Sequence, residues 1–179
     1  IWYFSTYQID QIHSKVKDNL LQEKLPWVIS SFPSLHDASQ EAGDITAMLL
    51  ILAPFETPEF WAARREPVSE RMLDKASEII PDLRHFIKSK FSATPCTLNR
   101  YTLNRNGSFV GWLSSVNQAK SNLLPQTASI GGLYLVGTWC TVGYPGQGGI
   151  PNVAASGRRG AMLVLRDMGK NWDFENLTL

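Results

Sequence analysis

The chain has 179 residues, enough for one core of ordinary size, and its 44% hydrophobic and 18% charged content is typical of a globular protein. A formal net charge of +1 provides no strong field for nucleic acid, which we do not expect as a partner. No apolar run approaches the roughly 20 residues of a membrane-spanning helix.

The cysteines, the histidines and the first residue of the sequence lead to three further expectations. The two cysteines lie far apart without metal-ligand or redox spacing, which favours a reducing compartment and a cytoplasmic protein. Peripheral membrane association stays open. The three histidines fall on separate predicted elements, so we expect no metal site. Because the sequence opens on Ile1 with neither an initiator Met nor a signal peptide, we expect a piece of a longer protein.

The first third of the chain predicts a helix and a strand. Apolar residues at helical spacing predict an amphipathic helix from Tyr7 to about Lys24, and Trp27 to Phe32 predicts a strand stopped by Pro33. Hydrolase-triad residue types follow at Ser34, His36 and Asp37. Triad members normally meet through the fold, so three neighbours in one loop indicate a turn or helix cap.

The middle of the chain predicts a central strand and then helices. Ile45 to Ala53 is apolar nearly throughout, as expected of a central strand. Thr57 to Lys90 is helical in pattern with a break at Pro81, and its charged residues are expected on a solvated face: Glu66, Glu70, Arg71, Asp74 and Lys75. Phe91 to Leu103 predicts a strand broken near Pro95. Asn106-Gly107 then predicts a hairpin turn leading to Ser108–Trp112, and residues 113–130 predict a loop.

A strand, a glycine-rich turn and a helix end the pattern. Leu133 to Val136 predicts a short buried strand, and the turn that follows contains Gly146, Gly148 and Gly149 before Pro151 opens a helix. Glycines allow a ligand close to the backbone, and unpaired amides at a helix start favour an electron-rich group. The alternative is a structural turn that binds nothing.

The last helix has a predicted packing face of small residues. Ala154, Gly157 and Ala161 are spaced for close packing on a sheet, while Arg158 and Arg159 either face solvent or reach toward phosphate. Gly169 is expected to end the helix.

Four runs resemble one family: WVISSFPSLHDAS, SERMLDKASEIIPDLRHFI, TPCTLNRYTLNRNGSFVGW and GLYLVGTWCTVGYPGQGGIPNVAASGRRGA. Together they are similar to the C-terminal part of FAD-dependent oxidoreductases of the phytoene desaturase and carotenoid cis-trans isomerase type, relatives of the amine-oxidase superfamily. The last run resembles the flavin-contact motif. The preference for isomerase over desaturase rests mainly on the letters PGQG.

The resemblance implies FAD as the cofactor and a set of binding residues. The backbone from Gly148 to Val153 is expected against the pyrimidine side of the flavin, and the residue after Gly137 near the ribityl-pyrophosphate. Much of the superfamily has an acid at that position, where this chain has Thr138. The implied cofactor-binding residues are Gly137, Thr138, Gly146, Gln147, Gly148, Gly149, Ile150, Pro151, Asn152 and Val153; no catalytic residue is assigned.

The resemblance also implies an α+β fold in two parts. Residues 1–130 are expected to form part of an antiparallel or mixed substrate-domain sheet with helices, and residues 131–179 the last strand and helix of a Rossmann-like FAD domain. A complete dinucleotide site needs a GxGxxG turn and a following acid, which this sequence lacks. We therefore expect an N-terminal half to supply the adenosine site, and the isolated chain to be inactive and to retain little or no FAD.

Three functions remain as hypotheses. The leading one is desaturation or cis-trans isomerisation of a hydrophobic polyene. A flavin amine oxidase is the second, with Trp139 and Tyr144 as aromatic walls beside the flavin. The third is a non-catalytic binding or interaction domain that uses the apolar sheet without a cofactor.

Overall fold

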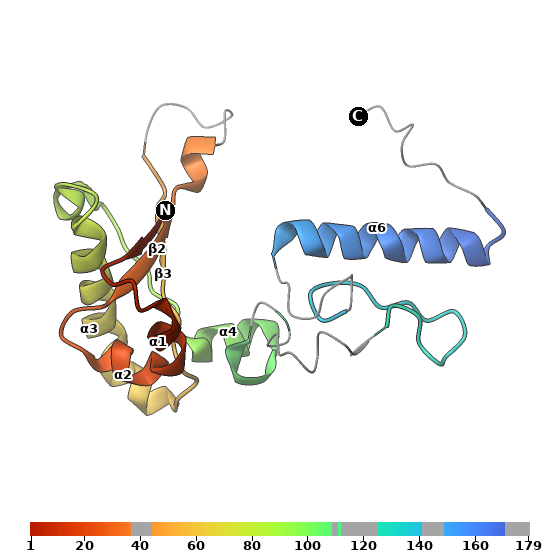
Figure 1. Ribbon diagram of the computed structural model, residues 1–179, viewed down its shortest axis with the longest axis horizontal. Coiled ribbons are helices and arrows are strands. Elements are labelled where there is room, and N and C mark those ends of the chain that lie inside the picture. The colour runs from red at the N-terminus through yellow and green to blue at the C-terminus, as the bar shows by residue number, and fades with distance from the viewer. Residues whose placement is uncertain (37–43, 109–110, 112–124, 141–148, 171–179) are drawn as a thin grey trace. The chain divides into compact units, whose positions relative to one another are not determined.

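The chain is an α+β protein, drawn from a computed structural model in Figure 1. The structure describes residues 1–36, 44–108, 111, 125–140 and 149–170. Two compact units are present, Ile1–Ser108 and Phe109–Leu179, and each is described by itself. The expected functional division after residue 130 falls inside the second unit and stays a prediction.

The first unit is built on an antiparallel sheet in the order β1-β2-β3 (Trp2–Phe4, Trp27–Ser31 and Met48–Leu50). The predicted strand after Pro26 is confirmed as β2, which is the central strand. The strand predicted at Ile45–Ala53 is confirmed over Met48–Leu50, but its predicted central position is wrong. Only Met48–Leu50 pairs, at an edge of the described sheet, because Ile51 and Ala53 pack instead against the core of this unit.

The two faces of the sheet meet different surroundings. Successive strand residues point to opposite faces, and Tyr3 points toward α3 (Pro58–Ser77), where its hydroxyl donates a 2.8 Å hydrogen bond to Glu78 Oε2. The opposite face is almost entirely apolar. It carries Ser31 together with the apolar residues Trp2, Phe4, Trp27, Ile29, Met48 and Leu50.

Part of this apolar face remains open. Phe4 stacks on Trp27 with 5.9 Å between ring centroids, whereas Trp2 is 71% exposed and Met48 53% exposed. The first unit therefore presents an aromatic and aliphatic surface to its surroundings.

The core of the first unit lies between α3 and the N-terminal helices. Leu20, Trp61 and Val68 form its centre, and α3 runs without interruption through Pro67. The predicted helix over Tyr7–Lys24 is present as two short helices, α1 (Ile9–Ser14) and α2 (Val16–Leu21). They separate at Lys15, whose φ of −118° is not helical.

The prediction of a strand over Phe91–Leu103 is wrong, because Pro95–Thr102 forms helix α4. Thr94 caps this helix by accepting the Thr97 N–H, and the Thr97 hydroxyl accepts the Thr94 N–H in return. Pro95 occupies the first turn, where its missing N–H costs nothing. This capping box outweighs the strand-like pattern of the residues around it.

The predicted Asn106-Gly107 hairpin is replaced by a turn that closes on α4. Both residues have positive φ (57° and 64°), as such a turn requires, but they belong to η3 (Arg105–Gly107). Asn99 Nδ2 donates to the Asn104 carbonyl at 2.8 Å and ties the turn to the helix. Most of the expected second strand lies outside the described residues.

Lys75 is buried, with 4% of its surface exposed, so its prediction as a solvated residue is wrong. Its Nζ lies 2.9 Å from Glu78 Oε2 and 4.9 Å from the centre of the Tyr3 ring. The hydrogen bond from Lys75 lowers the pKa of Glu78, and the hydrogen bond to Glu78 raises the pKa of Tyr3. One buried cation thus joins α3 to β1.

The other charged residues predicted on the surface are in contact with solvent. Several of them form ion pairs that hold the segment after Pro81 against α3. Arg84, in η2 (Leu83–Phe86), pairs with Glu70 at 2.7 Å and Asp74 at 2.6 Å. Lys90 pairs with Glu66 at 2.5 Å and also with Glu70. The hydrogen bonds from Lys90 and Arg84 lower the pKa of Glu70, and the one from Lys90 has the larger effect.

Helix α6 (Ile150–Asp167) is the main element of the second unit, and residues 125–140 lie beside it (Figure 1). Gly169 follows the helix with φ +70°, and the Lys170 N–H returns to the Leu165 carbonyl. The prediction that this glycine ends the helix is confirmed. No helix in the described parts of the chain is both long and apolar enough to cross a membrane.

We predict that the Lys75–Glu78 pair makes the first unit sensitive to acid. A carboxyl whose folded pKa is lowered adds stability that is complete above its unfolded value, near 4.5, and is lost as pH falls through the folded value. Urea unfolding of the chain at a series of pH values should show a shallower acid limb for both Glu78→Gln and Lys75→Met. If only one of the two variants flattened the limb, the pair would not be its cause.

Candidate functional site

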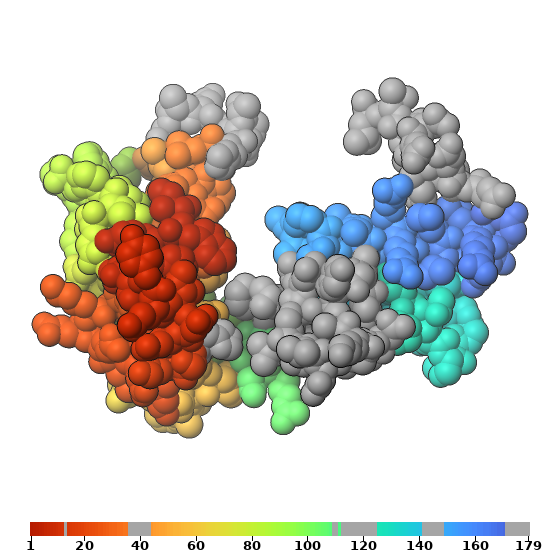
Figure 2. All heavy atoms as spheres, viewed as in Figure 1, coloured from red at the N-terminus to blue at the C-terminus, as the bar shows by residue number. Residues whose placement is uncertain are grey.

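Residues 133–137 run alongside α6 in the opposite direction, so that they end beside the N-terminal half of the helix. Tyr134 OH donates to Asp167 Oδ2 near the C-terminus of α6, and the Gly137 N–H donates to Ser156 Oγ at 3.0 Å. Val136 lies against Gly160, between these two contacts. Figure 2 shows the atoms of residues 125–140 lying directly against α6.

This segment is not the buried strand that the sequence predicts. Among the described residues, its strand-like backbone pairing is limited to one isolated antiparallel β-bridge, between Thr127 and Tyr134. Leu133 is 42% exposed and Val136 55% exposed, because no neighbouring strand among the described residues covers them. Most of the glycine-rich turn predicted after this segment lies outside the described residues, and the helix start that follows it is the beginning of α6.

Ser156 is fully buried and joins three segments of the second unit. Its hydroxyl accepts the Gly137 N–H, and Gln126 Nε2 lies 2.7 Å from its carbonyl oxygen and 3.2 Å from its hydroxyl. Gln126 Nε2 also lies 3.4 Å from the Leu135 carbonyl. The sequence analysis assigned neither Ser156 nor Gln126 a role.

The described binding residues flank the turn from both sides. Gly137 has φ +112° and Gly149 has φ +105°, conformations that favour glycine. A Cβ added at Gly137 would meet no atom within 4 Å. Gly146, Gln147 and Gly148 lie outside the described residues, as does Tyr144.

The start of α6 is not capped by a side chain of its N-cap residue Gly149. The Val153 N–H makes the first helical bond, to the Gly149 carbonyl at 3.1 Å. Pro151 lies in the first turn, as predicted, and Ile150 is 86% exposed. Asn152 is half-buried.

Thr138 follows Gly137 directly, and its Oγ1 is buried without a hydrogen-bond partner. Gly111 approaches so closely that a Cβ there would lie 2.5 Å from the Thr138 carbonyl oxygen. An unpaired buried hydroxyl is uncommon in a folded protein. Thr138 therefore has a buried hydroxyl without a hydrogen-bond partner among the described residues, at the end of the segment.

The prediction of Ala154, Gly157 and Ala161 as the packing face of α6 is wrong, because these residues are exposed and Ser156 and Gly160 are buried instead. A Cβ at Gly157 would meet nothing within 4 Å, whereas one at Gly160 would lie 2.4 Å from Val136 Cγ1. Small residues are also spaced four apart at Ser156 and Gly160, so the sequence contained this signal.

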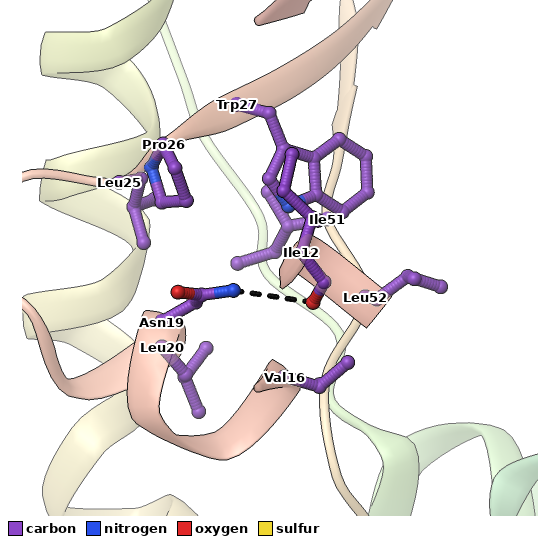
Figure 3. A pocket seen from close by; sticks show the side chains of 9 residues that line it. All are labelled: Ile12, Val16, Asn19, Leu20, Leu25, Pro26, Trp27, Ile51 and Leu52. Carbon is purple, nitrogen blue, oxygen red and sulfur yellow. Dashed lines mark hydrogen bonds between the residues drawn. The ribbon is translucent and has the colours of Figure 1, made fainter. Parts of the chain in front are cut away.

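The first unit contains an apolar hollow at one end of its sheet (Figure 3). Its empty volume is about 230 Å³, including space open to solvent. Asn19 is the polar side chain among its lining residues, and its Nδ2 is occupied by the Ile12 carbonyl at 3.1 Å. The lining residues are Ile12, Val16, Asn19, Leu20, Leu25, Pro26, Trp27, Ile51 and Leu52.

Comparison with known proteins gave no match, either to a protein-family model or to a curated protein. Within the described ranges, no three His, Cys, Asp or Glu side chains lie close enough together to hold a metal ion.

Ser34, one of the three residues of hydrolase-triad type, lies in a short 3₁₀ turn, η1 (Pro33–His36), and its Oγ accepts the Thr46 N–H at 2.9 Å. Asp37 lies outside the described residues.

We predict opposite effects for two alanine substitutions in α6. Gly160→Ala forces a methyl group into Val136 and should destabilise the chain by about 1–3 kcal/mol. Gly157→Ala meets open space and should stabilise it by up to about 1 kcal/mol through helix propensity. Thermal and urea unfolding of the two variants measure the difference. The reverse order would mean that Gly157, as the sequence suggested, is the close-packed glycine.

Proposed function

We propose that the chain is the C-terminal portion of an FAD-dependent oxidoreductase that desaturates or isomerises a hydrophobic polyene. The observation that carries the proposal is the arrangement of Gly137 and α6. The segment that ends at Gly137 is bonded to Ser156, six residues or about 9 Å along the helix from its start. The proposal places the cofactor at the N-terminus of α6, the usual position for a nucleotide cofactor.

Three features of the described residues fit FAD at this turn. Among the described residues, no atom lies within 4 Å of a Cβ built at Gly137 and Thr138 Oγ1 has no hydrogen-bond partner; the N-cap of α6 is Gly149, which has no side chain to cap the helix. FAD supplies the redox chemistry when it is bound. The amides at the start of α6 favour negative charge on an adjacent group, and Thr138 binds as a neutral hydroxyl where many relatives of the proposed family have an acid.

The first unit supports the substrate half of the proposal. Its partly open sheet face exposes Trp2 and Met48, Phe4 there is half-buried on the buried Trp27, and none of the strand residues on this face is charged. A conjugated polyene is long, flat and apolar, so it gains from such a surface through burial and ring contacts. The Rossmann-like surroundings of α6 and an adenosine site in an N-terminal half are parts of the same proposal.

The test is the absorbance spectrum of the complete polypeptide that contains this chain. We expect the two visible bands of an oxidised flavin after purification, and loss of FAD when residues 1–179 are expressed alone. A folded, colourless complete protein would contradict the proposal and favour a non-catalytic binding domain. Turnover of amines in place of polyenes would favour the amine-oxidase alternative.

We predict that the Thr138 hydroxyl contributes to FAD affinity. Thr138→Val keeps the shape of the side chain and removes one hydrogen bond, so the Kd for FAD should rise by about two- to tenfold. Thr127→Val is the matched control, because Thr127 is exposed in the same unit and lies outside the proposed site. Equal Kd values for both variants would remove Thr138 from the binding site.

A further inference from the structure

We propose that Gln126 is a positioning residue for the proposed FAD site. Through Ser156, it holds the Gly137–Thr138 backbone in place against α6. The identity of the ligand rests on the proposed function, while the positioning itself rests on the hydrogen bonds described above. Gln126 lies far from the turn in sequence, in a stretch whose composition predicts only a loop.

The side chain of Gln126 is oriented by its acceptors. It is 4% exposed, and its Nε2 faces two backbone carbonyls, those of Ser156 and Leu135. A carbonyl accepts but cannot donate, so the amide must present its NH₂ group to them. The direction of the side chain is therefore determined by α6 on one side and by the 133–137 segment on the other.

The same orientation leaves Gln126 Oε1 buried without a donor. An apolar side chain of similar volume would fill this space without an unpaired oxygen, so packing alone does not call for glutamine here. What the amide adds is a directional link between the helix and the segment beside it.

This link continues to the turn through Ser156. The Ser156 hydroxyl is within hydrogen-bond distance of Gln126 Nε2 and accepts the Gly137 N–H. Thr138, with its unpaired hydroxyl, is the next residue. Displacement of Ser156 or Gln126 would therefore move the point from which the chain enters the turn, and with it the distance to the amides at the start of α6.

A second contact between the same two elements provides an internal control. Tyr134 bonds to Asp167 near the C-terminus of α6, at the opposite end from the turn. Tyr134→Phe removes a hydrogen bond between the same partners but leaves the Gln126–Ser156–Gly137 chain intact. A general loosening of the unit would follow from either loss, whereas displacement of the turn would follow only from the loss of Gln126 or Ser156.

The experiment compares Gln126→Met, Ser156→Ala and Tyr134→Phe in the complete polypeptide. For the first two we expect a Kd for FAD about tenfold higher or more, since small displacements of a binding backbone have large effects. We also expect a lower flavin midpoint potential, because displaced amides stabilise negative charge on the reduced flavin less well. Tyr134→Phe should leave both quantities unchanged.

Hydrogen exchange of the same proteins without FAD separates this proposal from the proposed function. Amides of residues 137–140 and of Gly149, Ile150, Asn152 and Val153 should exchange faster in Gln126→Met and Ser156→Ala but not in Tyr134→Phe. A colourless wild-type protein with this exchange pattern would overturn the flavin assignment and support the positioning role. Wild-type exchange in the first two variants, or equal acceleration in all three, would overturn the positioning role. Ser156→Ala removes only a hydroxyl and serves if Gln126→Met does not fold.

Discussion

The second unit depends on the full burial of Ser156, a small polar residue in the middle of α6. Most buried hydroxyls are paired, and this one accepts the Gly137 N–H and lies 3.2 Å from Gln126 Nε2. These bonds fix the relative position of α6 and residues 133–137 along their common axis. Gly160 then allows Val136 to approach one turn further on. The position of Gly137 relative to the start of α6 follows from this register.

In the first unit, the polar contacts and the exposed apolar residues lie on different faces of the sheet. Lys75, Glu78 and Tyr3 connect α3 to one face of the sheet, and the ion pairs of Arg84 and Lys90 hold the following segment on the outer side of α3. The other face of the sheet has no such partners and stays apolar. A surface of this kind is suited to a long hydrophobic ligand, which is the class of substrate that we propose.

Local signals predicted some elements correctly and misled at others. Pro26 and Pro33 enclose β2, and Gly169 ends α6, because proline and glycine act on the backbone at their own position. Around Pro95 the sequence predicted a broken strand, although Thr94 and Thr97 supplied a capping box for α4. For Ile45–Ala53, hydrophobicity indicated burial but did not distinguish a strand from an extended segment that packs against helices.

The sequence by itself determined the start of α6 near Pro151 and its end at Gly169, because proline suits the first turn of a helix and glycine the position after its last turn. The α+β class was expected from the family resemblance and agrees with the structure. Only the tertiary structure decided which face of α6 is buried and that Lys75 is enclosed. Those outcomes depend on residues distant in sequence: Gln126 and Val136 select Ser156 and Gly160, and Tyr3 covers Lys75. Helical spacing offers several equivalent faces, and the choice among them is made by the partners that the rest of the chain brings to the helix.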